Sequence, residues 1–174
     1  MTRLEPRTAE HARALFPALH RSPVMDTLVW DGPDDEATLV SAYEAQGERT
    51  RRGEAHDFTI VADDGTPVGC LSVRPEAGEP RRGDLGILVT VPHQGKGHAT
   101  RAVALALAYA FERLGWVKCE ASVFVGNDRS RALFARHGFV LEGTRRRAVH
   151  KRGVWRDEWL LGLTREEWAA RDGA

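Results

Sequence analysis

The stretch from Leu85 to Ala110 constrains the fold of this chain more than any other part of it. An apolar run rich in β-branched residues, Leu85 to Val91, predicts a buried strand. A stripe of strong helix formers at helical spacing begins at Thr100 and predicts a helix. The connection between them contains two glycines, Gly95 and Gly97. The chain is therefore expected to place a flexible glycine loop where a strand gives way to a helix.

A loop of this kind is suited to bind a phosphate or pyrophosphate. The first N–H groups of a helix have no partners within it and carry the positive end of its dipole. Gly95 and Gly97 let backbone approach an anion closely, and Lys96 adds a positive charge. The P-loop does not fit, because Lys96 is followed by Gly97, and GxGxxG does not fit, because Thr100 occupies its third glycine position. A turn without a ligand is the alternative.

The other elements follow from local pattern. Further strands are expected at Leu4, Asp57–Ala62, Val68–Val73, Val117–Val125, Phe139–Val149 and Val154–Leu163. Further helices are expected after Thr8, after Asp34 or Asp35, over Asn127–His137, and after Thr164, which forms a capping box with Glu167. The segment Pro75 to Gly83 predicts a loop. Together they predict one α+β domain over residues 1–174, with a mixed, mostly antiparallel sheet and helices on both faces, and with the Leu85 and Val117 strands parallel.

Composition narrows the possible partners. The chain has 25 basic and 25 acidic residues, so no overall field favours nucleic acid or an acidic membrane. The run Arg145-Arg146-Arg147 is local and predicts a solvated face. Neither Cys70 and Cys119 nor the seven histidines show the spacing of a disulfide framework or metal site. Residues 1–20 are charged throughout, and no run approaches membrane-spanning length, which predicts a cytoplasmic protein.

A co-linear set of motifs carries a family resemblance. Gln94-Gly95-Lys96-Gly97-His98-Ala99 matches Q-x-x-G-x-A, and the later pieces follow in order: Asn127 to Ser130, Gly138-Phe139 and Glu142-Gly143. Over about residues 55 to 163 the chain resembles the GNAT N-acetyltransferases, in the branch that includes the ribosomal-protein alanine and serine N-terminal acetyltransferases. The resemblance implies the GNAT acyl-CoA fold and a central strand that carries a bulge and diverges from the next strand.

The resemblance also implies a cofactor site for acetyl-CoA without a metal. Backbone of Ile87, Val89 and Val91 would bond the pantetheine arm. The pyrophosphate would be held by the loop Gln94, Gly95, Lys96, Gly97, His98, Ala99 and Thr100. Asn127 and Ser130 would lie beside the pantetheine and sulfur, and Phe134 would line the channel.

The catalytic residues depart from family patterns. Many relatives have a tyrosine acid where this chain has Phe134, so the resemblance assigns the acid role to Ser130, with helix capping or cofactor bonding as the alternative. Val149 stands where part of the branch has a glutamate base. The base is therefore open between a water chain and four side chains, Asp84, Glu120, His93 and His150.

These observations predict an acetyl-CoA-dependent N-acetyltransferase acting on a primary amine, as a monomer or a homodimer. A peptide N-terminus would need a groove open at both ends. A small cation would need clustered carboxylates, which only Asp26, Asp31, Asp34 and Asp35 are positioned to supply. A catalytically silent acyl-CoA-binding module and an RNA-associated factor using Arg145 to Arg147 are the alternatives.

Overall fold

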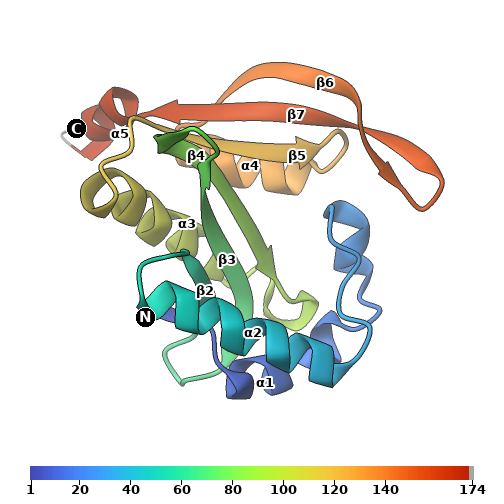
Figure 1. The fold of residues 1–174 in the computed structure, drawn as a ribbon. Coiled ribbons are helices and arrows are strands. Elements are labelled where there is room, and N and C mark those ends of the chain that lie inside the picture. Colours follow the sequence, from blue (N-terminus) through green and yellow to red (C-terminus); the bar gives the residue numbers. More distant parts are fainter. Residues whose placement is uncertain (173–174) are drawn as a thin grey trace.

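A seven-stranded sheet organises the chain (Figure 1). The computed structural model describes residues 1–172, so the last two residues of the expected domain 1–174 lie outside the described part. Its elements are β1 (Arg3–Pro6), α1 (Ala9–Leu19), α2 (Glu36–Arg51), β2 (Asp57–Val61), β3 (Pro67–Glu76), β4 (Glu79–Val89), α3 (His98–Ala108), β5 (Lys118–Phe124), α4 (Asp128–Arg136), β6 (Val140–Lys151), β7 (Val154–Thr164) and α5 (Arg165–Asp172). Short 3₁₀ turns cover Pro23–Thr27 and Val91–His93, and a π-helical turn over Tyr109–Arg113 continues α3.

The strand order confirms the expected mixed sheet. It reads β1-β2-β3-β4-β5-β7-β6, and β4 with β5 is the parallel pair among antiparallel neighbours. The parallel pair is joined by α3, because a parallel connection must cross the sheet. The glycine loop therefore lies directly at the end of the strand that forms the centre of the sheet (Figure 1).

Local capping explains where the helices begin. Thr8 accepts a hydrogen bond from the amide of His11, and Asp35 does the same for Thr38. Thr164 and Glu167 exchange hydrogen bonds as the expected capping box of α5. The observed helix starts match those predicted from the sequence, because each capping hydrogen bond joins residues that are no more than four positions apart.

Two apolar layers cover the sheet. On one face α1 and α2 pack with Leu88 of β4 around Leu15, Leu19 and Tyr43. On the other face α3 and α4 pack over Leu85 and Val89 of the same strand, in a larger cluster that includes Phe111 and Trp116. Alternate residues of β4 thus face opposite helical layers, as a strand buried on both sides requires.

Three expectations about the strands are corrected. The segment Pro75–Gly83 is not a loop, because β3 and β4 extend through it and turn only at Gly78. Its polar composition reflects a hairpin end that projects into solvent and pairs charges across the strands, as Arg82 does with Glu76. The central strand ends at Val89, since Val91 lies in a 3₁₀ turn.

The third correction concerns the bulge. The register of β3 with β4 is continuous from Gly69–Val89 to Pro75–Gly83, and its irregularity falls between Pro75 and Glu76, near the hairpin end. The expected divergence of the two central strands therefore occurs without a bulge next to Val89.

Trp116 fixes the point where β4 and β5 begin to pair. Its side chain is fully buried and packs against Gly83, where an added Cβ would lie 2.6 Å from the indole ring. We expect Trp116→Ala to lower the free energy of unfolding by about 3–5 kcal/mol, because the removed ring leaves a cavity. Urea titration measures the change. Trp155→Ala is the control: that ring is 55% exposed, and its loss is expected to cost under about 0.5 kcal/mol. Equal losses in the two variants would contradict this account of the core.

Candidate functional site

The parallel pairing of β4 with β5 stops after three residues. Arg82, Gly83 and Asp84 pair with β5, and β4 then continues alone to Val89. Over the same span β5 pairs with β7 along its whole length. The two central strands therefore part like a V, with Asp84 at its apex.

The open edge of β4 carries unpartnered backbone groups. The amide of Thr90 donates to the carbonyl of Val68 at 2.9 Å. Hydrogen-bonded pairs recur at every second residue of an antiparallel ladder, so the backbone N–H of Leu88, like that of Thr90, points toward β3. The backbone N–H groups of Ile87 and Val89 point the other way, into the gap. An extended ligand arm can pair with these amides as an added strand would.

The glycine loop has the backbone shape of an anion site. Gly95 and Gly97 have φ values of 78° and 82°, a left-handed conformation that L side chains avoid. An added Cβ would meet nothing within 4 Å at either position, so the space around the loop is open. No side chain of residues 1–172 caps α3, and the amides of His98, Ala99 and Thr100 at its first turn are available to a diphosphate.

Gln94 has a role that the motif alone does not reveal. Its Nε2 donates to the carbonyl of Val89 at 2.9 Å, and its Oε1 accepts from the Arg129 guanidinium. Gln94 therefore ties the end of β4 to the start of α4. Arg129 was missed by the sequence analysis, although it lies inside the Asn127 to Ser130 match. Its charge stands beside the glycine loop, where a diphosphate would need it.

The first turn of α4 faces the gap from the other side. Asn127 caps this helix by accepting from the amide of Ser130 at 3.2 Å. The Ser130 hydroxyl makes no hydrogen bond within residues 1–172 and lines the cavity, so it is free to meet a ligand. Phe134 is buried and packs edge-on against Phe139, with 5.0 Å between ring centroids. It thus lines the channel and belongs to the core at once.

Lys96 and His98 complete the predicted loop residues. Lys96 is exposed, and His98 bonds through Nδ1 to the Thr2 hydroxyl at 3.0 Å, which ties the loop to the start of the chain. Val91 has an exposed side chain and lies beyond the strand, so it does not continue the open edge of Ile87 and Val89. Its binding role stays a prediction.

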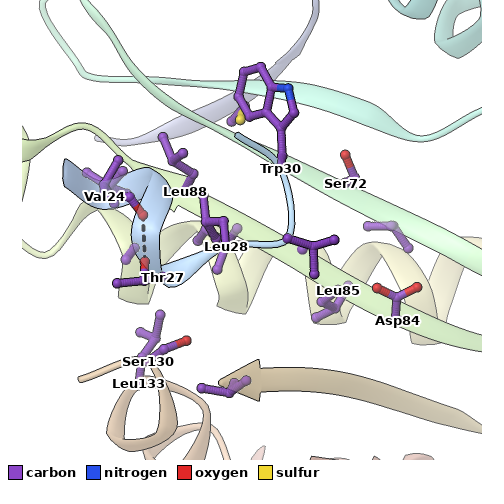
Figure 2. Close-up of a pocket in the computed structure, with 18 of the residues that line it drawn as sticks. Val24, Thr27, Leu28, Trp30, Ser72, Asp84, Leu85, Leu88, Ser130 and Leu133 are labelled. Atoms are coloured by element: carbon purple, nitrogen blue, oxygen red, sulfur yellow. Dashed lines mark hydrogen bonds between the residues drawn. The ribbon is translucent and has the colours of Figure 1, made fainter. Parts of the chain in front are cut away.

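One cavity of about 1750 Å³ joins these parts. It runs from the glycine loop through the gap to the face covered by α1 and α2. We call residues 23–31, which close that face, the strap. Figure 2 shows Leu28 and Trp30 of the strap, Asp84 of β4 and Ser130 of α4 around this cavity. We call the part of the cavity beside the loop the donor arm and the part beneath the strap the acceptor arm, after the roles that the family resemblance predicts for them.

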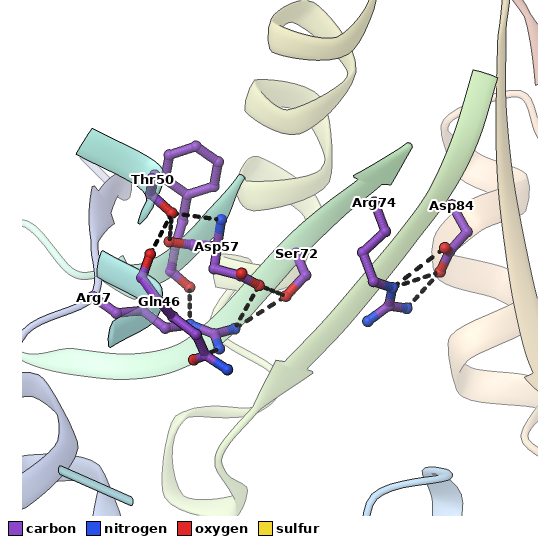
Figure 3. Close-up of polar contacts among 8 residues, drawn as sticks. Arg7, Gln46, Thr50, Asp57, Ser72, Arg74 and Asp84 are labelled. Carbon is purple, nitrogen blue, oxygen red and sulfur yellow. Dashed lines mark hydrogen bonds and ion pairs between the residues drawn. The ribbon is translucent and has the colours of Figure 1, made fainter. Parts of the chain in front are cut away.

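The carboxylates of the acceptor arm are mostly paired with arginines. Figure 3 shows two groups, one joining Arg7 to Asp57 and Ser72, and the other joining Arg74 to Asp84. A third pair joins Arg145 to Glu158, whose side chain is 4% exposed, at 2.6 Å. Glu158 also lines the cavity and was missed by the sequence analysis. Its one signal in the sequence is its place in G-x-x-x-D-E-W, residues 153–159, which follows the other motifs that resemble the GNAT enzymes.

The four candidate bases separate by position. Asp84 lines the cavity at the apex of the V. Glu120 lies outside it and pairs with Lys118 at 3.0 Å, and His150 lies outside it against the Trp155 ring. His93 lies by the glycine loop, where burial and the charges of Lys96 and His98 lower its pKa. Asp84 is the candidate that the fold brings to the acceptor arm.

The expected acidic cluster is neutralised within the chain. Asp26 pairs with Arg152, Asp31 pairs with both Lys151 and Arg152, and Asp35 caps α2. Of the four aspartates only Asp34 keeps no such partner within residues 1–172. Residues of the β6–β7 turn pair with Asp26 and Asp31, and Asp35 is used as the cap of its own helix. The four aspartates therefore do not form the cluster of free carboxylates that a small polycation would need.

Lys151 fastens the strap to the sheet. Its side chain is buried, and Nζ donates to the carbonyls of Met25 at 2.6 Å, Leu28, and Trp30 at 3.1 Å. A buried ammonium needs such acceptors because desolvation penalises its charge. The wall of the acceptor arm is thus held in place by a residue 120 or more positions away.

Residues 1–172 contain neither a membrane-spanning helix nor a cluster of metal ligands. No helix there is both long and apolar enough to cross a membrane. No group of three or more His, Cys, Asp or Glu side chains gathers there in the arrangement of a metal site.

Comparison with known proteins identifies relatives. The family model described as "Acetyltransferase (GNAT) domain" matches residues 2–140. The chain is 33% identical to the "Probable N-acetyltransferase YjcK" of Bacillus subtilis over 67% of this chain and 65% of YjcK. It is 31% identical to the "Putative ribosomal N-acetyltransferase YdaF" of the same organism over 60% of this chain and 57% of YdaF. The chain thus spans less than two thirds of the length of both relatives.

A solved structure supports the fold. The spermidine N-acetyltransferase of Vibrio cholerae in complex with CoA and spermine superposes with a TM-score of 0.82 at 20% identity, over 97% of this chain and 98% of that one. The seven-stranded α+β architecture is therefore the GNAT fold.

Removal of the Lys151 ammonium tests the strap. We expect Lys151→Met to lower the free energy of unfolding by about 2 kcal/mol, because three carbonyls lose a charged donor. Arg152→Met removes the neighbouring exposed ion pairs and is expected to cost less than about 1 kcal/mol. Denaturant titration measures both variants. A Lys151→Met protein as stable as the wild type would show that the strap does not depend on this contact.

Proposed function

This chain is a member of the GNAT acetyltransferase family, and from that premise we propose that it transfers the acetyl group of acetyl-CoA to a primary amine. One observation carries the proposal: the parting of β4 and β5 leaves a free strand edge that leads directly to an open glycine loop. A linear arm ending in a diphosphate fits such a site.

On the donor side, each part of acetyl-CoA has a candidate partner. The amides of Ile87 and Val89 would pair with the pantetheine arm. The amides from Gly95 to Thr100, with Lys96 and Arg129 nearby, would hold the diphosphate. The residues present fit this ligand because the loop has both the backbone shape and the empty space that a diphosphate requires.

On the acceptor side, Asp84 would orient the amine and take its proton. Acetyl-CoA supplies the thioester, whose carbonyl carbon is attacked by the neutral amine. The N–C bond forms, the C–S bond breaks, and the proton that the amine nitrogen loses balances the proton that the thiolate gains. Starting from the protonated amine, the products are therefore the acetylated amine, the free thiol and the one proton that Asp84 has passed to solvent. A gap-facing amide of β4 would stabilise the developing oxyanion, and the Ser130 hydroxyl would protonate the departing thiolate.

The acceptor proposed is an α-amine, such as the N-terminus of a ribosomal protein. The cavity continues past the gap beneath the strap, which gives a chain room to extend. A relative 31% identical to this chain is described as a putative ribosomal N-acetyltransferase, whereas the spermidine enzymes of Escherichia coli and Vibrio cholerae are 27% and 20% identical to it. The arginine partners of Asp57, Asp84 and Glu158 argue against a polyamine.

A silent acyl-CoA-binding module is the second candidate. It is favoured by Phe134, which lines the cavity where many relatives have a tyrosine, offers no hydroxyl and packs against Phe139. Such a module would bind acetyl-CoA and release no thiol with any amine. An assay of thiol release from acetyl-CoA in the presence of amines therefore distinguishes the two functions.

Turnover tests the proposed transferase. We expect the wild type to release CoA thiol when acetyl-CoA is mixed with a peptide that has an N-terminal alanine, and Asp84→Asn to lower kcat about 100-fold, because the amide cannot accept the proton. Acetyl-CoA affinity should not change. Glu120→Gln is the control, since Glu120 lies outside the cavity, and should keep the wild-type rate. Acetyl-CoA binding with no thiol release for any amine would favour the silent module.

The glycine loop is tested by binding. Gly97→Ala and Gly65→Ala each place a side chain at a left-handed position with open space, so each should lose about 1–2 kcal/mol of stability. Only Gly97→Ala should also weaken acetyl-CoA binding, by about tenfold or more in Kd, because the strained loop no longer aims its amides. Isothermal titration calorimetry gives Kd. Equal Kd values for both variants would remove the loop from the site.

A further inference from the structure

The acceptor arm contains an ion pair with a particular construction. Arg74 and Asp84 lie opposite each other on β3 and β4, and both line the cavity. The Arg74 Nε lies 3.3 Å and 3.2 Å from the two Asp84 oxygens, and Nη2 bonds to one of them as well. Their side chains are 58% and 41% exposed, so both partners remain reachable by a ligand.

Gly86 makes this arrangement possible. An added Cβ at Gly86 would lie 2.8 Å from Nη2 and 3.0 Å from Nη1 of Arg74. The backbone of Gly86 does not have a positive φ, so the glycine is required for space and not for conformation. The guanidinium can therefore lie against β4 beside the gap only because no side chain stands there.

The pair still has hydrogen-bonding capacity. Nη1 of Arg74 makes no hydrogen bond within residues 1–172, and one oxygen of Asp84 is bonded only by the longer Nε contact. The hydrogen bonds that Arg74 donates to the Asp84 carboxylate raise the pKa of Arg74, so the guanidinium is charged. Next to the apex of the V, the protein thus offers a carboxylate oxygen and an N–H donor side by side.

This pattern matches one chemical unit. An α-amino carbonyl group has an ammonium donor and a carbonyl acceptor separated by only two carbon atoms. A simple alkylamine has only the first, and a polyamine has further ammonium groups that would find arginines where they need carboxylates. The substituent on the α-carbon would meet the apolar strap residues Leu28 and Trp30, which line the same cavity.

We propose that Arg74 is a specificity-determining residue that binds the carbonyl oxygen adjacent to the amine held by Asp84. The acceptor class is then an α-amino carbonyl compound, which is either a peptide N-terminus or an amino acid derivative. The inference rests on the proposed acetyltransferase function, because it assigns the acceptor of that same site.

The experiment compares two acceptors, alaninamide and isopropylamine, in which a methyl group replaces the carboxamide. kcat/KM is measured for both with the wild type, Arg74→Lys and Gly86→Ala. Lysine keeps the charge but loses the fork of donors, and the alanine displaces the guanidinium while keeping every charge. We expect the alaninamide to isopropylamine ratio to fall about 10- to 100-fold in both variants, mainly through the KM of alaninamide.

Arg82→Lys is the matched control. Arg82 forms the neighbouring cross-strand pair with Glu76 on the same hairpin but lies outside the cavity, so its variant should keep the wild-type ratio. Using the ratio of acceptors cancels both their different basicity and any general loss of activity. Gly86→Ala supplies the answer if Arg74→Lys does not fold.

The outcomes are distinguishable. A wild type that acetylates both acceptors, with a ratio unchanged in either variant, overturns the inference and leaves the transferase standing. Spermidine acetylated with a kcat/KM above that of alaninamide overturns it as well. A wild type that binds acetyl-CoA and acetylates none of these amines overturns the proposed function itself, and the inference falls with it.

Discussion

Backbone amides at the centre of a sheet need partners, and β4 has amides that the sheet itself does not satisfy. Past Asp84, the amides of Ile87 and Val89 face a gap because the pairing of β4 with β5 ends there, while β5 stays paired with β7. An unsatisfied buried amide costs free energy comparable to a lost hydrogen bond. The amides of β4 avoid this cost because the gap is open, so that water or a ligand can accept their hydrogen bonds. The helices α3 and α4 begin at the open end of the same gap, which gathers their amides near one point.

The charges around this gap follow a second constraint. Asp57, Asp84 and Glu158 each have an arginine from another strand or from the N-terminal segment, because an unpaired carboxylate would be penalised by desolvation. The buried ammonium of Lys151 would be penalised by desolvation in the same way, and it is stabilised by the hydrogen bonds that it donates to strap carbonyls. The acceptor arm is therefore close to neutral as a whole while remaining locally polar. A neutral arm discriminates by the placement of donors and acceptors, and total charge contributes little to its selectivity.

The sequence predicted the features that depend on near neighbours. Caps such as Thr8, Asp35 and Thr164, the glycine loop and the helical stripe after it are all set within a few residues. It did not predict features that depend on distant partners. The hairpin through Pro75–Gly83 is stabilised by charges facing each other across two strands, and the strap aspartates are neutralised from the β6–β7 turn. Arg129 and Glu158 each lie inside a matched motif, but the motifs do not show that these two side chains line the cavity, since only the fold brings them there. Gly86 has an ordinary backbone conformation, and a glycine is needed there only because the Arg74 guanidinium of the neighbouring strand occupies the space of a side chain.

The absence of a hydroxyl at Phe134 bears on how the proposed chemistry divides between the two arms. A thiolate is a weak base and a good leaving group, so the donor arm needs little help from an acid, and in the proposed mechanism the Ser130 hydroxyl would supply it. The amine is a stronger base and arrives protonated, so the harder proton transfer belongs to the acceptor arm. The carboxylate of Asp84 and the guanidinium of Arg74 accordingly lie at the apex of the V, and the ring of Phe134 is apolar and packs on Phe139. Selectivity and proton removal would then reside in the same pair of side chains.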